Sequence, residues 1–302
     1  MEVPIILDTD IGSDVDDCMA LLLACASPEI KLLGVTTGGG EAPRRARLAV
    51  QLLRRAARDD VPVYAGMSSR LLRYEPSHFS PYDGHGLSIA DVTNADYEPQ
   101  HAVQYLLRMA RERGPDVTLV TIGPLSNIAA AVALDPQVMS CLRELVVMGG
   151  VFWGERAQRG EYNVSSDPEA TRIALTLPIP TTFVGLDVTL QAVNGPQHMA
   201  RLKAAGSPLT ELAHSLLAHY QARLGREFNC LHDPLALTCA FDQRFVQFVE
   251  APVGIVTEEG ERRGTMSLLE EGAPKRLARQ VDGLAFMDFF VQRMIALGRR
   301  LA

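Results

Sequence analysis

ILDTDIGSDVDDCMALLLA (residues 6–24) joins two apolar segments through a short turn that is rich in aspartate. The first segment is short and continuous, as in a buried strand, and the second is long enough for a helix. Carboxylates this close together repel one another, and a solvated turn tolerates one or two of them. We therefore predict a strand–turn–helix unit whose turn surrounds a positive charge. The aspartates of this stretch are Asp8, Asp10, Asp14, Asp16 and Asp17.

The alternation of apolar strand and helix continues along the chain. IKLLGVTT (30–37) precedes the amphipathic stretch 41–57, whose arginines we expect to face water, and VTLVTIG (117–123) precedes the helix-like segment 124–134. Such a pattern predicts a parallel sheet that is covered on both faces. The predicted fold class is α/β, with a mostly parallel central sheet flanked by helices and a small antiparallel addition near the C-terminus, at 251–282. We expect a single domain over residues 1–302.

Composition narrows the class of protein. The chain of 302 residues is 47% apolar and 22% charged, with a formal net charge of -7. This acidity argues against nucleic acid or an anionic membrane as a partner, since either favours a basic surface. No apolar run approaches the roughly 20 residues that span a bilayer, the N-terminus has no signal-peptide pattern, and the cysteines form no CxxC pair. We expect a cytoplasmic protein.

The carboxyl ends of parallel strands are where ligands bind in such sheets. The acidic turn follows the first strand, so Asp10 lies at that edge, and Asp16 and Asp17 begin the next helix, where the helix dipole favours negative charge. An N-cap cluster on a solvated turn would account for two of the carboxylates. A hard cation such as Ca²⁺ or Mg²⁺, held by oxygen ligands, accounts for the excess.

Three further segments bring suitable groups to the same edge. TIGPLSN (121–127) follows a strand and offers backbone carbonyls, and LHDPLAL (231–237) places His232 beside Asp233 at a helix start. GEYNVSSDPEA (160–170) offers side chains that bind hydroxyl groups. Taken singly, a histidine next to an N-cap aspartate is more often structural, and a loop glutamate more often lies on the surface.

The order and spacing of these motifs resemble the inosine–uridine nucleoside hydrolase family. The motifs are DTDIG…DD, GPLSN, VVMGG, EYN…DPEA and HDPLA, and the resemblance covers about residues 5–240. It implies a Rossmann-like nucleoside hydrolase fold and hydrolysis of ribonucleosides to nucleobase and ribose. It also implies a bound Ca²⁺ and assembly into a homodimer or homotetramer.

The resemblance assigns one group of residues to the metal and the water. It implies that carboxylates of Asp10, Asp17 and Asp233 hold Ca²⁺, together with the backbone carbonyl of Ile122. Asp10 is also implied to activate the attacking water by taking its proton.

A second group is implied to handle the substrate. Asp16, Glu161 and Asn163 would bind the sugar hydroxyls, and Met148 would pack against the ribose. His232 would assist departure of the nucleobase, which needs a proton donor because it leaves with negative charge.

The sequence also departs from the common pattern of the family. Three residues separate Gly12 from the aspartate pair where one is usual, so Asp14 could replace Asp16 or Asp17. The preferred base stays open: the single tryptophan is Trp153, and further stacking candidates are Phe152, Tyr220 and Phe228, with His85 in a predicted long loop at 67–97.

Two other functions remain as alternatives. Asp8 and Asp10 at a strand end suggest a haloacid-dehalogenase-like phosphatase, although the threonine and lysine expected of that family do not match well. A non-catalytic protein that binds a nucleoside or Ca²⁺ would keep the pocket without turnover.

Overall fold

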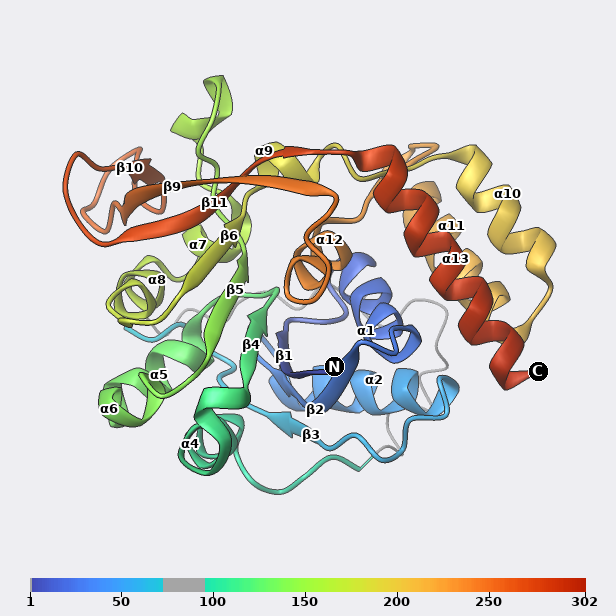
Figure 1. Cartoon of the computed structure of the whole chain (residues 1–302), viewed down its shortest axis with the longest axis horizontal. Helices are drawn as coiled ribbons and strands as arrows, with labels where there is room; N and C mark the ends of the chain where they lie inside the picture. The colour runs from blue at the N-terminus through green and yellow to red at the C-terminus, as the bar shows by residue number, and fades with distance from the viewer. Residues whose placement is uncertain (1, 73–95) are drawn as a thin grey trace.

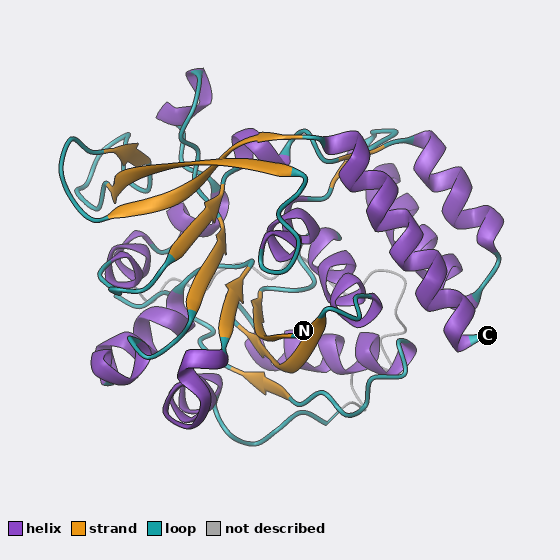
Figure 2. Ribbon diagram, viewed as in Figure 1, coloured by secondary structure: helices purple, strands orange, loops and turns teal. Residues whose placement is uncertain are grey.

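A nine-stranded sheet forms the centre of the protein, with helices on both faces (Figure 2). The computed structural model describes residues 2–72 and 96–302. Most of the loop predicted at 67–97, including His85, lies outside the described residues.

The strands alternate with helices along most of the chain, as predicted (Figure 1). The strands are β1 (Val3–Thr9), β2 (Ile30–Thr37), β3 (Val63–Ala65), β4 (Thr118–Thr121), β5 (Glu144–Met148), β6 (Thr181–Val184), β7 (Val193–Asn194), β8 (Asn229–Cys230), β9 (Val246–Ile255), β10 (Met266–Leu268) and β11 (Pro274–Val281). The α-helices are α1 (Asp16–Ala26), α2 (Ala42–Arg55), α4 (Ala102–Arg113), α5 (Ser126–Leu134), α6 (Pro136–Met139), α7 (Tyr162–Ser166), α8 (Pro168–Leu175), α9 (Leu186–Thr189), α10 (Pro196–Ala205), α11 (Pro208–Leu224), α12 (His232–Cys239) and α13 (Gly283–Leu301). Short 3₁₀ helices are η1 (Gly114–Asp116) and η2 (Glu155–Gln158).

The strand order places a topological switch point between β1 and β4. The order is β10-β9-β11-β6-β5-β4-β1-β2-β3, so the chain runs outward from β1 in one direction and later from β4 in the other. The pairings among β1 to β6 and between β6 and β11 are parallel. Ligands bind at the carboxyl ends of strands beside such a point.

The antiparallel addition predicted near the C-terminus is present, and it extends the main sheet. β9 pairs antiparallel with β11 and β10, while β11 pairs in parallel with β6. The addition is therefore continuous with the parallel strands. Helix α13 follows the addition and begins at Gly283.

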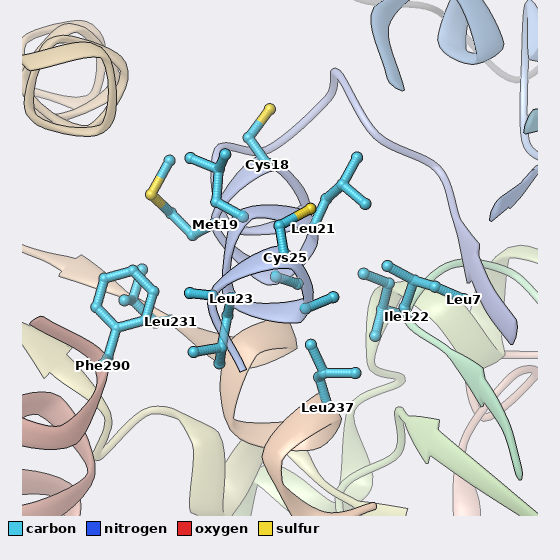
Figure 3. Close-up of a cluster of buried hydrophobic side chains, with 14 of the residues drawn as sticks. Leu7, Cys18, Met19, Leu21, Leu23, Cys25, Ile122, Leu231, Leu237 and Phe290 are labelled. Carbon is cyan, nitrogen blue, oxygen red and sulfur yellow. The ribbon is translucent and has the colours of Figure 1, made fainter. Parts of the chain in front are cut away.

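Alternate residues of β1 enter different cores. Ile5 and Leu7 join the core that contains α1, α12 and α13, whereas Ile6 joins the core beneath α4 and α5. Each residue of α1 is buried, because this helix lies between the sheet and other helices. Figure 3 shows its side chains, including Cys18 and Cys25, among those of neighbouring elements.

The segment between β6 and α12, for which the sequence pattern gave no prediction, holds the helices α10 and α11. The short antiparallel pair β7–β8 leads directly into α12 and its first residue, His232. Within the described residues, no helix combines the length and the hydropathy needed to cross a membrane.

Candidate active site

A cavity of about 310 Å³ lies beside the switch point, at the carboxyl ends of β1, β4 and β5. Its volume suits a small organic ligand. Its lining includes every residue predicted to be catalytic, substrate-binding or metal-binding, namely Asp10, Asp16, Asp17, Ile122, Met148, Glu161, Asn163, His232 and Asp233. The other lining residues are Ser13, Asp14, Tyr162 and Leu186.

The floor of the cavity is a cluster of buried carboxylates. One oxygen from each of Asp16, Asp17 and Asp233 lies within 4.8 Å of the others, and Asp10 lines the same cavity. Asp16 Oδ2 accepts the backbone N–H groups of His232 (3.1 Å) and Asp233 (3.2 Å). The first turns of α1 and α12 therefore meet at this cluster, and both helix dipoles favour negative charge there.

These carboxylates resist ionisation while they lie together without a cation. Burial, followed by the charges of neighbouring aspartates, raises the pKa of Asp16, Asp17 and Asp233 well above the ordinary value. The donor atoms are all oxygens and they converge from two helices and a strand end. This donor set fits a hard divalent cation, whose charge would offset the repulsion.

Two glycines allow the turn to reach the strand ends. Gly12 has φ of 110°, a conformation that other residues rarely adopt. A Cβ at Gly123 would lie 2.8 Å from both the backbone nitrogen and Oδ1 of Asp10. A side chain at position 123 would therefore displace Asp10 from the cavity.

The buried side chain of Arg45 binds the backbone of the acidic turn. The prediction that the arginines of 41–57 face water is therefore wrong at this position. The side chain is 1% exposed and donates hydrogen bonds to the carbonyls of Asp10, Ile11 and Gly39 and to Ser13 Oγ. Its charge lowers the pKa of Asp10, against a larger rise from burial. The burial of Arg45 could have been predicted from the helical spacing, because Arg45 falls on the stripe of small buried residues in α2. That stripe is Ala42, Ala46 and Ala49.

The opposite wall is built around Asn163. Its Nδ2 donates to the carbonyls of Ile122 (3.0 Å) and Met148 (3.1 Å), so it joins the ends of β4 and β5. Glu161 caps α7, since its carboxylate accepts the N–H groups of Asn163 (2.7 Å), Val164 (3.2 Å) and Gly150 (3.0 Å). Burial raises the pKa of Glu161 to about 7.

His232 reaches the cavity from the start of α12. Its Nδ1 lies 2.7 Å from the hydroxyl of Thr189, the last residue of α9. Burial lowers the pKa of His232 below its ordinary value, and the charge of Asp14 acts in the opposite direction. Thr189 was missed by the motif reasoning, because nothing in the local sequence marks it as a partner of a residue 43 positions later.

Comparison with known proteins places this cavity in a family. A model described as "Inosine-uridine preferring nucleoside hydrolase" matches residues 5–288. The chain belongs to this family. The predicted family, fold and enzyme class are thereby confirmed, because nucleoside hydrolases are glycosidases that act on the N-glycosidic bond.

Individual nucleoside hydrolases resemble the chain over most of its length. The pyrimidine-specific ribonucleoside hydrolase RihB of Escherichia coli is 32% identical over 259 residues, which cover 84% of this chain and 80% of RihB. The purine-preferring ribonucleoside hydrolase from Gardnerella vaginalis is 27% identical, with a TM-score of 0.88 over 98% of this chain and 99% of that one. A plant nucleoside hydrolase, PpNRh1, shares the fold with a TM-score of 0.83, 23% identity, and coverage of 98% and 100%.

The aromatic residues considered for base stacking are not among those that line the cavity of this nucleoside hydrolase. Trp153 donates its indole N–H to the carbonyl of Ala278, and Phe152 packs edge-on against Phe183. The hydroxyl of Tyr220 donates a hydrogen bond to Asp14 Oδ2 (2.7 Å). Neither Tyr220 nor Phe228 is among the described residues that line the cavity. Among the described residues, Tyr162 is the aromatic side chain that lines the cavity.

The position of Asp8 does not suit a phosphatase nucleophile, which has to reach its substrate. Its side chain is 1% exposed and accepts hydrogen bonds from Thr36, Thr121 and Asn127. Asp8 thus braces β1 against its neighbours, and the haloacid-dehalogenase-like alternative loses one of the two aspartates on which it rested.

Proposed function

We propose that the protein is a Ca²⁺-dependent ribonucleoside hydrolase in which Asp10 activates water and His232 assists the departing nucleobase. The observation that carries this proposal is the cavity at the switch point, where carboxylates, an amide and an imidazole converge. The family membership supplies the reaction class.

The proposed ligands of the ion are the carboxylates of Asp10, Asp17 and Asp233 and the backbone carbonyl of Ile122. All four line the cavity, and oxygen donors of this kind suit Ca²⁺. When bound, Ca²⁺ supplies positive charge that orients the ribose hydroxyls and favours loss of a proton from water. Asp16 is set apart from the ligands because one of its oxygens already accepts two N–H groups of α12.

In this proposal, the sugar is held by polar groups at both walls. Asp16, Glu161 and Asn163 bind its hydroxyls, while Met148 packs against the ring. Breaking the N-glycosidic bond develops positive charge on the sugar, as in other glycoside hydrolysis. The buried carboxylates around the cavity stabilise that charge without having to reorganise.

The remaining steps concern the water and the base. Asp10 takes a proton from the attacking water, and the fixed position of its backbone over Arg45 keeps the carboxylate aimed at the cavity. His232 faces the base and stabilises the negative charge that the base acquires.

The proposal is tested by supplying ribonucleosides and their 2′-deoxy counterparts and measuring free base and reducing sugar. We expect hydrolysis of ribonucleosides and little hydrolysis of deoxyribonucleosides, since the sugar diol is a binding element. Equal rates on the two series would contradict the proposed sugar contacts. Calorimetric binding of ribonucleoside with no release of base would instead support a non-catalytic binding protein.

The proposal extends to the cellular setting expected from the resemblance. We propose a cytoplasmic enzyme of nucleoside salvage that works as a homodimer or homotetramer. Light scattering of the purified protein would test the assembly, and a monomer with full activity would contradict it.

A further inference from the structure

One contact of His232 has no role in the mechanism described so far. The hydroxyl of Thr189 lies 2.7 Å from Nδ1 of the imidazole. Thr189 is 0% exposed and ends α9, the short helix that follows β6. The backbone N–H of His232 is bound to Asp16 Oδ2, so both the main chain and one ring nitrogen of this histidine are fixed.

The direction of the hydrogen bond follows from the surroundings of the hydroxyl. A buried hydroxyl needs an acceptor for its proton, because an unsatisfied buried donor costs free energy. Thr238 in α12 meets this need in the usual way, by donating to the carbonyl of Pro234 one turn earlier (2.7 Å). Within the part of the chain that the structure describes, the ring of His232 is the one partner of the Thr189 hydroxyl. The hydroxyl therefore donates, and Nδ1 accepts.

This direction decides which nitrogen carries the proton. A neutral imidazole has one N–H and one acceptor nitrogen. If Nδ1 accepts, the proton is on Nε2, which is the nitrogen left to serve the cavity that His232 lines. The opposite tautomer would present a lone pair to the departing base and would repel its negative charge.

We propose that Thr189 is a positioning residue that fixes His232 in the Nε2–H tautomer, so that a neutral imidazole donates a hydrogen bond to the departing nucleobase. The inference rests on the proposed function for its kinetic consequence. The electron pair of the broken N-glycosidic bond stays on the base, the attacking water gives its proton to Asp10, and Nε2–H stabilises the base anion until solvent protonates it.

The tautomer is measured directly by long-range ¹H–¹⁵N correlation spectra of the full-length protein in Ca²⁺, with His232→Gln used to assign the signals. We expect the Nε2 signal of a protonated nitrogen and the Nδ1 signal of an unprotonated one. Thr189→Val should produce a mixture of tautomers, and Thr189→Ser should restore the wild-type pattern. A wild-type protein with its proton on Nδ1 would overturn the proposal. This readout does not depend on turnover.

Kinetics then separate positioning from general damage. On uridine, whose base leaves poorly, Thr189→Val should lower kcat by about 10- to 100-fold, a part of the usual value of acid assistance, with little change in KM. On 4-nitrophenyl riboside, whose leaving group needs no assistance, the rate should stay within about twofold of wild type. Equal losses on both substrates would show a structural role and overturn the proposal.

A matched control removes a second buried hydroxyl. Thr238→Val deletes a hydroxyl of the same helix that carries His232, and it should leave the ratio of the two rates unchanged. A change in that ratio as large as that of Thr189→Val would also overturn the proposal. If wild-type protein hydrolyses neither substrate, the proposed function fails, while the spectra still decide the tautomer.

Discussion

Single side chains divide the cavity into two chemical halves. Asp16, Asp17 and Asp233 form a carboxylate floor beside Asp10, and His232 is the imidazole that lines the same cavity. A floor of this kind suits a sugar that becomes positive, and a proton-bearing ring suits a base that becomes negative. The two halves should therefore be separable by substitution.

His232→Ala should slow the hydrolysis of nucleosides with poor leaving groups by about 10²–10⁴-fold, the range usual for loss of a positioned side chain that assists a leaving group. Ribose binding should be nearly intact, because the ring is assigned to the base and not to the sugar. The measurement is kcat for uridine together with inhibition by free ribose. Loss of ribose affinity with unchanged turnover would contradict the assignment.

Where a motif carried them, the side chains that meet at the cavity could be predicted from the sequence, and their roles stay predictions. The aspartates, His232, Glu161 and Asn163 stood in recognisable segments, and the structure brings them to one cavity. Thr189 was not predictable, because its role depends on how α9 and α12 meet in the fold.

At the scale of elements, the acidic turn depends on α2 as well as on the two helices that start at the cavity. The guanidinium of Arg45 binds successive carbonyls of the turn, so it sets the path of the backbone that carries Asp10. The spacing of apolar residues correctly predicted a helix in this segment. The assumption that arginine side chains face water was wrong for Arg45, whose side chain is buried. A buried cation is tolerated here because carbonyls and a hydroxyl satisfy its donors.

Arg45→Met should lower the free energy of unfolding by about 2–4 kcal/mol, because the carbonyls of the turn would lose a buried donor. Arg44→Met is the matched control: the Arg44 side chain is 41% exposed and pairs with Glu41 at 3.3 Å, so its loss should cost less than about 0.5 kcal/mol. Urea denaturation of both variants gives the comparison. Equal stability of the two variants would refute the bracing role of Arg45.

At the scale of the whole molecule, the sheet order explains why distant segments share one cavity. β1 and β4 are neighbours, so the acidic turn and Ile122 meet, and α12 is brought against α1 by the helical layer on the same face (Figure 1). The alternation of strands and helices was readable from sequence. The continuity of the C-terminal strands with the main sheet was not, because strand pairing between distant segments leaves no local pattern.

The stability of the metal-free protein should fall as pH rises from about 4.5 to about 7. Burial raises the pKa of Glu161 to about 7 in the folded state, above its value of 4.5 in an unfolded chain. The folded state thus binds more protons in this range. The stability that the protonated Glu161 contributes is therefore lost as pH rises through the folded pKa. The free energy of unfolding in chelator, measured across this range, checks the sign. A rise in stability with pH under these conditions would contradict it.

Restoring Ca²⁺ to protein stripped by a chelator tests the central claim most directly. Uridine hydrolysis should be absent from the stripped protein and should recover in proportion to bound Ca²⁺, reaching a plateau at one ion per chain, as calorimetry of the same titration would count. Full hydrolysis by the stripped protein would contradict the account. So would a recovery of hydrolysis on adding Ca²⁺ that is undiminished in Asp233→Asn, because the ion would then not act at the aspartate cluster.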